Sequence, residues 1–236
     1  MTLAYLRGFL VLSAALWLVP AGASASPPAG ERRETEVVDR NFPFNPDGHL
    51  KLNNFSGKIT ITGSNRANVV VHAIRSATRE RLEGIRLEIE ASASEISIEA
   101  NRKNGHWEDR NNNVVDTEFE IEVPERATLD VNAFSSDVRI TGVEGRQKVH
   151  TFSGEIRVDS AAGPLDIETF SGDIEVDLAS SVSGRVDFDS FSGSLDTNMP
   201  MTYRTGNKRH VTGDIGTAGG ANTFHFKTFS GDVRIK

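Results

Sequence analysis

Carboxylates recur at one position of a short motif in the second half of the sequence. The motif is a Phe-Ser-Gly turn followed by an acidic residue, as in Phe170-Ser171-Gly172-Asp173. The acidic residues at or equivalent to this position are Asp137, Glu155, Asp173, Asp214 and Asp232. Carboxylates stacked at strand spacing repel one another unless they are solvated, interleaved with cations such as Arg139 and Arg157, or bound to Ca²⁺. Because the glycine-aspartate nonapeptide repeats that bind Ca²⁺ are absent, we expect solvated turns and no metal or cofactor.

A second group of carboxylates, Asp187 and Asp189, alternates with apolar residues along one segment. A carboxylate pair of this kind could act on a glycosidic bond, because glycosidases use two such groups. Alternating carboxylates occur in almost every repeat, however, so nothing singles this pair out. The turn serines lack a Gly-x-Ser-x-Gly elbow, and the six His residues show no metal-binding spacing. We therefore predict that the protein is not an enzyme, with a polysaccharide-acting enzyme as a remaining alternative.

The turns that carry these residues repeat at a nearly constant interval. The steps between the third positions of successive motifs, from Ser136 through Gly154, Gly172, Gly193 and Gly213 to Gly231, are 18, 18, 21, 20 and 18 residues. Apolar residues alternate with polar ones on both sides of each turn, which indicates strands with one buried face. The sequence therefore predicts an all-β fold, a single β-solenoid of roughly 18- to 21-residue coils.

The turn residues themselves are expected to be structural. Each turn Phe should stack on the next at about 4.8 Å and form an internal ladder in the core. The glycines should supply the backbone freedom of the bend. The residues assigned to these turns and to the core are Phe55, Gly57, Phe134, Phe152, Gly154, Phe170, Gly172, Phe191, Gly193, Gly213, Phe229 and Gly231. Further strands are expected at 50–52, 58–62, 69–74, 85–90, 95–100, 118–123 and 129–131, with a helical turn at 78–82.

The first 25 residues have the pattern of a secretory signal peptide. Arg7 precedes an apolar run of about 12 residues, too short to span a bilayer, and Ala23-Ser24-Ala25 offers a cleavage site. Residues 26–48, rich in Pro and charge, are expected to form a tether, and residues 49–236 the repeat domain. We predict an exported protein, periplasmic or extracellular, with no transmembrane segment in the mature chain.

Net charge makes nucleic acid an improbable partner. After Ala25 the chain carries 25 Lys and Arg against 33 Asp and Glu, a net charge of −8. An acidic chain does not attract a polyphosphate backbone. With no Cys anywhere in the sequence, folding cannot depend on disulfides.

Two irregular segments interrupt the repeat, and insertions in a solenoid usually project as loops. The first, 101–113, contains His106 and Trp107 and could contact a glycan or a protein. The second, 198–210, contains Arg204, Lys208 and Arg209, which could meet an anionic partner. These five residues are the candidate partner-binding site, and an ordinary solvated loop is the competing interpretation for each segment.

Several of these motifs together resemble a known family. They are Val123-Pro124-Glu125, the Ser-Gly-Asp-Ile-type turns and the C-terminal Phe229-Ser230-Gly231-Asp232-Val233-Arg234-Ile235. The chain resembles, over roughly Leu50 to Lys236, the bacterial β-strand-repeat proteins described as putative adhesins, a domain family of unknown function. The resemblance implies a β-helix-like domain at or outside the cell envelope and carries over no catalytic residues.

Taken with the residues, the resemblance predicts a non-enzymatic structural or interaction module of the bacterial cell envelope. The expected partner is an envelope protein or a glycan. A binding protein that senses a glycan or a partner through the 101–113 loop is the alternative. The last strand, Asp232 to Lys236, is expected to leave an unpaired edge through which two chains could associate.

Overall fold

The structure, a computed structural model, describes residues 33–103, 114–207, 209–216 and 220–236. These residues form 17 strands and one short helix, so the predicted all-β class is confirmed. The elements in chain order are β1 (Arg33–Pro43), β2 (His49–Ser64), β3 (Asn68–Thr78), α1 (Arg79–Gly84), β4 (Ile85–Ala91), β5 (Glu95–Lys103), β6 (Asp116–Pro124), β7 (Thr128–Thr141), β8 (Gln147–Ser153), β9 (Ile156–Ala161), β10 (Leu165–Ser171), β11 (Ile174–Leu178), β12 (Gly184–Ser192), β13 (Leu195–Thr197), β14 (Met201–Gly206), β15 (His210–Ile215), β16 (Asn222–Ser230) and β17 (Val233–Ile235). No helix among the described residues is long and apolar enough to cross a membrane.

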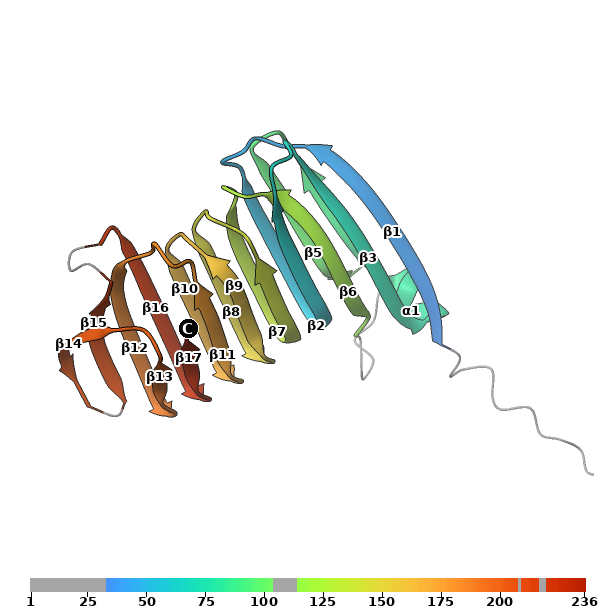
Figure 1. Cartoon of the computed structure of the whole chain (residues 1–236). Coiled ribbons are helices and arrows are strands. Elements are labelled where there is room, and N and C mark those ends of the chain that lie inside the picture. Colours follow the sequence, from blue (N-terminus) through green and yellow to red (C-terminus); the bar gives the residue numbers. More distant parts are fainter. Residues whose placement is uncertain (1–32, 104–113, 208, 217–219) are drawn as a thin grey trace, which may run out of the picture. The chain divides into compact units, whose positions relative to one another are not determined.

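The strands pair side by side in two rows that share the long strands β2 and β7 (Figure 1). The first row contains the segments before the Phe-Ser-Gly bends, in the order β4-β5-β2-β7-β8-β10-β16-β12-β15-β14. The second row contains the segments after the bends, in the order β1-β3-β6-β2-β7-β9-β11-β17-β13. Each bend therefore carries the chain from one row to the other.

Within each row the repeated segments pair in parallel and in register. Ser153 of β8 lies opposite Ser135 of β7 and Ser171 of β10, so residues 18 positions apart are neighbours. Ser171 and Ser192 in turn both lie opposite Ser230 of β16. The recurring motif thus marks equivalent positions on adjacent strands, as its spacing predicts.

The C-terminal strands do not lie at the end of the stack, which corrects two expectations. β16 lies between β10 and β12, and β17 pairs with both β11 and β13 (Figure 1). The edge expected at Asp232 to Lys236 is therefore not free, and self-association through it is excluded. The motif copy at Val211 to Ile215 is also not a bend, because it lies in β15, which runs antiparallel to β12 and β14. Gly213 is accordingly a strand residue.

The expected tether is also wrong for its described part. Residues 33–43 form β1, which pairs antiparallel with β3 along its whole length. β1 is an edge strand, and Pro is tolerated on edge strands. The Pro-rich composition of this segment therefore did not exclude a strand. The first strand of the second row is therefore β1, and the row begins before residue 49.

The hydrophobic core lies between the two rows. Alternation places Leu165 and Ile167 of β10 and Ile174 and Val176 of β11 inward, all at most 2% exposed. The largest buried side chains include Phe119, Phe188, Phe224 and Phe226. Inward residues of both rows belong to one continuous cluster. Burial of this many aliphatic and aromatic side chains is the main stabilising contribution in a chain without disulfides.

Glycine is required at the bends because neighbouring bends approach closely there. Gly154, Gly172 and Gly231 have φ between 136° and 151°, and a Cβ on Gly172 would lie 2.1 Å from the carbonyl oxygen of Gly154. A side chain cannot be accommodated at such a contact. Ser136, the one departure from Gly, has no positive φ, and its buried hydroxyl accepts a hydrogen bond from the Asn54 side chain.

The acidic residues after the bends connect adjacent bends. Asp137 accepts a hydrogen bond from the backbone N–H of Glu155, and Asp173 accepts one from that of Asp232, both at 2.9 Å. Asp232 in turn accepts hydrogen bonds from the backbone N–H and the hydroxyl of Ser194. These bonds lower the pKa of Asp232 below its usual value of 3.8, the Ser194 hydroxyl contributing most. Asp137, Glu155, Asp173 and Asp232 are thus exposed, as expected, and three of them also accept hydrogen bonds from turn N–H groups. The expectation is wrong for Asp214, which is buried in β15.

Candidate functional site

The bend phenylalanines form one continuous stack on the surface. In spatial order they are Phe55, Phe134, Phe152, Phe170, Phe229 and Phe191, here called the Phe ladder. Successive ring centroids lie 4.7–4.8 Å apart, and the rings are within 14° of parallel. The predicted stacking is correct, except that Phe229 lies between Phe170 and Phe191. Its predicted place in the core is wrong, because the six side chains are 40–57% exposed.

Strand alternation explains why the Phe ladder lies outside. In β10, Leu165, Ile167 and Thr169 point inward, so Phe170 falls at an outward position. The inward positions beside the ladder are filled by Thr151, Thr169 and Thr228, which are 3–7% exposed. The alternation that identified the core residues also predicts that the Phe side chains lie on the surface. The interpretation of the sequence overlooked this signal.

The stack exposes ring edges and covers ring faces. Each internal ring has a neighbouring ring on both sides, at a distance that leaves no room for another group. At the Phe191 end, the guanidinium carbon of Arg209 lies 5.3 Å from the ring centroid, a cation–π contact. The Phe ladder therefore presents a narrow stripe of aromatic C–H edges.

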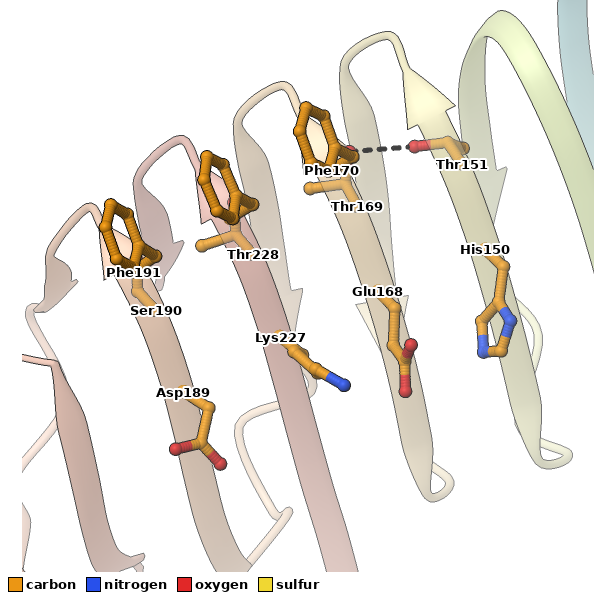
Figure 2. Close-up of a pocket in the computed structure, with 11 residues that line it drawn as sticks. His150, Thr151, Glu168, Thr169, Phe170, Asp189, Ser190, Phe191, Lys227 and Thr228 are labelled. Atoms are coloured by element: carbon orange, nitrogen blue, oxygen red, sulfur yellow. Dashed lines mark hydrogen bonds between the residues drawn. The ribbon is translucent and has the colours of Figure 1, made fainter.

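A groove lies beside the ladder on the first row of strands. It has a volume of about 550 Å³ and is bordered by Phe170, Phe229 and Phe191. Figure 2 shows a row of polar side chains on the same strands, namely His150, Glu168, Lys227 and Asp189 on β8, β10, β16 and β12. These four residues are opposite one another in register. The groove thus has one aromatic wall and one wall of alternating charge.

Hydroxyl groups form the floor of the groove. The Thr151 hydroxyl hydrogen-bonds that of Thr169 at 3.0 Å (Figure 2). The hydroxyl oxygens of Thr228 and Ser190 are buried and have no partner in the structure. A buried hydroxyl without a partner is unfavourable, and both oxygens lie below the accessible surface.

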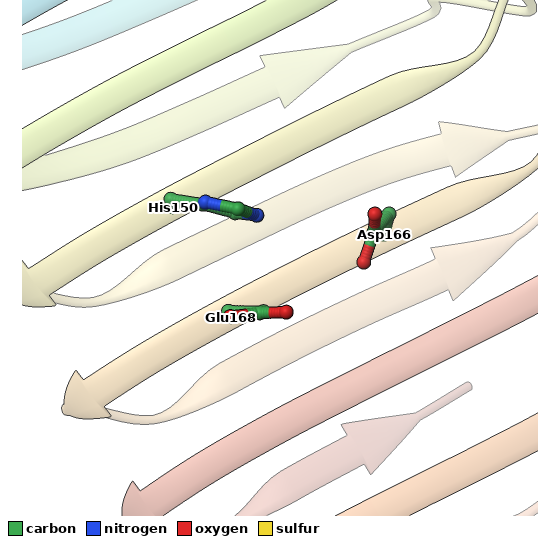
Figure 3. A group of neighbouring side chains, drawn as sticks. All are labelled: His150, Asp166 and Glu168. Atoms are coloured by element: carbon green, nitrogen blue, oxygen red, sulfur yellow. The ribbon is translucent and has the colours of Figure 1, made fainter.

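A histidine and two carboxylates meet beside this groove. A nitrogen of His150 and an oxygen of each of Asp166 and Glu168 all lie within 4.8 Å of one another (Figure 3). These donor types suit a divalent cation. Lys148 and Lys227, the register neighbours of Asp166 and Glu168, supply positive charge on the adjacent strands. Among the described residues, the buried Asp166 Oδ1 and His150 Nε2 have no hydrogen-bond partner.

The carboxylate pair considered for catalysis has a similar environment. Asp187 and Asp189 lie within 4.8 Å of His210 on the adjacent β15. The Asp189 carboxylate and His210 Nδ1 are 2.6 Å apart. This hydrogen bond raises the pKa of His210 above its usual 6.5, and the charges of Asp189 and Asp187 act in the same direction. Asp189 is thus bound to an imidazole, which the linear sequence did not indicate.

The predicted partner-binding residues are only partly described. His106, Trp107 and Lys208 lie outside the described residues, so the 101–113 loop stays a prediction. Arg204 pairs with Asp214, whose residue is 6% exposed, at 2.5 Å, which makes it a structural ion pair. Arg209 lies at the end of the Phe ladder. Arg204 and Arg209 thus contact different residues, Asp214 and Phe191.

Comparison with known families finds a similarity over the second half of the chain. Residues 125–236 match the model of a family described as Toastrack DUF4097. This part of the chain, here called the Toastrack residues, resembles that family. The Toastrack residues include all elements from β7 to β17 and five of the six rings of the Phe ladder. The resemblance found in the turn motifs, to an adhesin-like domain family of unknown function, is confirmed.

Solved structures extend the similarity in fold beyond the Toastrack residues. A putative cell adhesion protein from Clostridium sporogenes is 15% identical, with a TM-score of 0.60, and the match covers 87% of this chain and 99% of that one. A putative adhesin from Bacteroides fragilis is 9% identical, with a TM-score of 0.31, over 85% of this chain and 97% of that one. No curated protein matches the sequence. The first similarity indicates that the strands before residue 125 share the fold of a solved protein.

Proposed function

We propose that the protein is an exported, non-enzymatic interaction module of the bacterial cell envelope, and that the Phe ladder with its groove is the binding surface. The observation that carries this proposal is the exposure of six stacked phenylalanines in one stripe. Soluble monomers seldom expose large continuous apolar patches without using them. Aromatic side chains are also the residues that most often dominate binding energy in interfaces.

The size of the stripe supports a binding role. With exposures of 40–57% and about 200 Å² for a whole Phe side chain, the six rings present roughly 550 Å² of apolar surface. This value lies at the upper end of the largest patch found on typical monomers, about 300–600 Å². Each ladder ring contributes less to the free energy of folding than a core Phe does, because a core Phe is completely buried and a ladder ring is only about half buried.

The fold supports the proposal by holding the ladder rigid. We propose that the repeated segments are coils of a β-solenoid, each 18 to 21 residues long where the motif recurs regularly. Parallel pairing on both sides of each coil fixes the bends at strand spacing. A binding surface on such a scaffold loses little conformational entropy when a partner docks.

Export is part of the same proposal. The signal-peptide pattern in residues 1–25 favours it, and so does the absence of Cys, which makes folding independent of the redox state of the compartment. An adhesin-like role is in keeping with the descriptions of the proteins that share the fold. Expression with a C-terminal tag followed by cell fractionation and N-terminal sequencing tests export, and a protein retained in the cytoplasm with Met1 intact would contradict it.

The binding surface is tested by affinity capture from envelope fractions. The mature protein should retain an envelope component that the double variant Phe152→Lys/Phe170→Lys loses. Tyr203→Lys is the matched control, because Tyr203 is 66% exposed but lies on β14, outside the ladder. Equal capture by the ladder variant and the wild type would overturn the assignment of the surface.

A further inference from the structure

The Phe ladder repeats at the strand spacing, and this restricts what can cover it. We propose that the ladder of one chain docks against the ladder of a second copy of the same chain. The proposal rests on the proposed function, since it takes the ladder as the binding surface and names the partner. It replaces the C-terminal edge, which is paired on both sides, as the route to self-association.

Spacing is the first argument. Ring centroids lie 4.7–4.8 Å apart along all five steps of the ladder. A partner can fit against every step only if its own contacts repeat at about the same distance, which is the separation of paired β-strands. A second ladder has this repeat by construction. Identical side chains stacked at this distance form dry, well-packed contacts when two sheets meet.

Area is the second argument. Two ladders that cover each other would bury roughly 1,100 Å² from the phenylalanines alone, twice the roughly 550 Å² that one ladder presents. Specific interfaces start at about 1,000 Å² in total and commonly reach 1,200–2,000 Å². Residues beside the ladder, such as Ser135, Ser171 and Ser230, are exposed and would add to the contact. The ladder is therefore large enough for a dimer without any further surface.

The chemistry of the ladder disfavours other occupants. A sugar stacks on the face of an aromatic ring, but the internal rings cover one another's faces, and Arg209 lies over Phe191. A bacterial membrane surface carries anionic lipids, whereas exposed carboxylates follow the ladder along one side. These carboxylates are Asp137, Glu155, Asp173 and Asp232. A second ladder packs against the ring edges and needs no access to the ring faces.

The same surface on both partners gives a closed dimer. When one patch contacts itself, the two chains are related by a two-fold axis and no patch is left to add a third chain. The midpoint of the ladder lies between Phe152 and Phe170, the third and fourth rings in spatial order. Lysines at these two positions would place like charges in the centre of the contact.

Sedimentation equilibrium of the mature protein, residues 26–236, tests the proposal. The wild type should show a concentration-dependent monomer–dimer equilibrium, and Phe152→Lys/Phe170→Lys should raise its dissociation constant by at least about 100-fold. Tyr203→Lys should leave it unchanged. Far-UV circular dichroism and a thermal melt establish that each variant is folded. A wild type that stays monomeric at about 100 µM, or a folded ladder variant that dimerises like the wild type, would overturn the proposal.

Cross-linking provides a second test that leaves all six rings intact. The chain has no Cys, so a single introduced thiol can be linked only to that of another chain. Ser171→Cys, exposed next to Phe170, should give dimers with a short bis-maleimide. Ser180→Cys, exposed between β11 and β12 at the other end of the same coil, should not. Equal cross-linking at the two positions would contradict docking through the ladder.

The outcomes separate this proposal from the proposed function. If the wild type is monomeric but captures an envelope component only with an intact ladder, self-docking fails and the interaction module stands. If the monomer instead floats with phosphatidylcholine vesicles and the ladder variant does not, the occupant is lipid and self-docking is again overturned. A ladder-dependent dimer that captures nothing would support self-docking and remove the envelope partner.

Discussion

Phenylalanine occupies two regions of this protein with opposite environments. Phe188, Phe224 and Phe226 are completely buried in the core between the two rows, whereas Phe170 and Phe229 of the ladder are 45% exposed. Both sets belong to the same row of strands, and only the odd or even position along the strand separates them. Strand alternation thus places one set of Phe side chains in the core, where they stabilise the fold, and the other set on the surface.

Removing one ring from the core and one from the ladder should give the largest difference in the free energy of unfolding. Phe188→Ala should lower the free energy of unfolding by about 3–5 kcal/mol, because it leaves a cavity in the core. Phe191→Ala on the same strand β12 should lower it by only about 1 kcal/mol, since that ring is 57% exposed. Urea unfolding followed by circular dichroism measures both. Comparable losses for the two variants would break the distinction between core and ladder.

The bend glycines position the ladder, and they can be tested next. Gly172→Ala should destabilise the protein by at least about 2 kcal/mol, because the residue has φ of 150° and its Cβ would meet the Gly154 carbonyl oxygen. Gly142→Ala is the matched control. Gly142 also has a positive φ, 66°, but its Cβ would meet no atom within 4 Å. A loss at Gly142 as large as that at Gly172 would mean that backbone conformation alone, and not the approach of coils, requires glycine.

Much of this arrangement could be predicted from the sequence. The 18-residue motif spacing identified the parallel neighbours, and alternation identified the inward Leu165, Ile167, Ile174 and Val176. Extending that alternation to Thr169 would also have placed Phe170 outside. The error arose because the large apolar ring was assigned to the core by residue type, without counting positions along the strand.

The spatial order of the repeated strands could not be predicted, for a physical reason. All copies of the motif present the same bend and the same inward pattern, so any copy can stack on any other. In this chain β16 lies between β10 and β12, and β17 lies between β11 and β13. The contacts of His210 with Asp189 and of Arg204 with Asp214 follow from antiparallel pairing of β15, which no motif marks.

The carboxylate column beside the ladder should contribute less to the free energy of unfolding than the bend glycines do. Asp232→Ala should lower the free energy of unfolding at neutral pH by about 1 kcal/mol, because the Ser194 N–H and hydroxyl lose their acceptor. The pKa of Asp232 is lowered in the folded state, so this contribution is present above pH 3.8 and is lost as the pH falls through the folded value. Urea unfolding at pH 7 and about pH 2 measures it. Asp177→Ala, at an exposed carboxylate with no hydrogen bond in the structure, should have no effect at either pH.

The smallest expected effect concerns His210 at the far end of the groove. Its pKa should lie above 6.5 in the folded protein and return toward that value in Asp189→Asn, which NMR titration of the imidazole measures. Because the folded pKa is raised, the contact stabilises the protein fully below pH 6.5 and this stabilisation is lost as the pH rises through the folded value. An unchanged His210 pKa in Asp189→Asn would show that the hydrogen bond does not form in solution.

Hydroxyl-radical footprinting tests most directly whether the Phe ladder is an exposed surface that a second copy covers. In dilute protein the ladder rings, for example Phe152 and Phe170, should be oxidised readily, whereas Phe188 and Phe226 should be protected. At concentrations where the dimer forms, the ladder rings should also become protected and the core rings should not change. Ladder rings as protected as Phe188 in the dilute monomer would contradict the account.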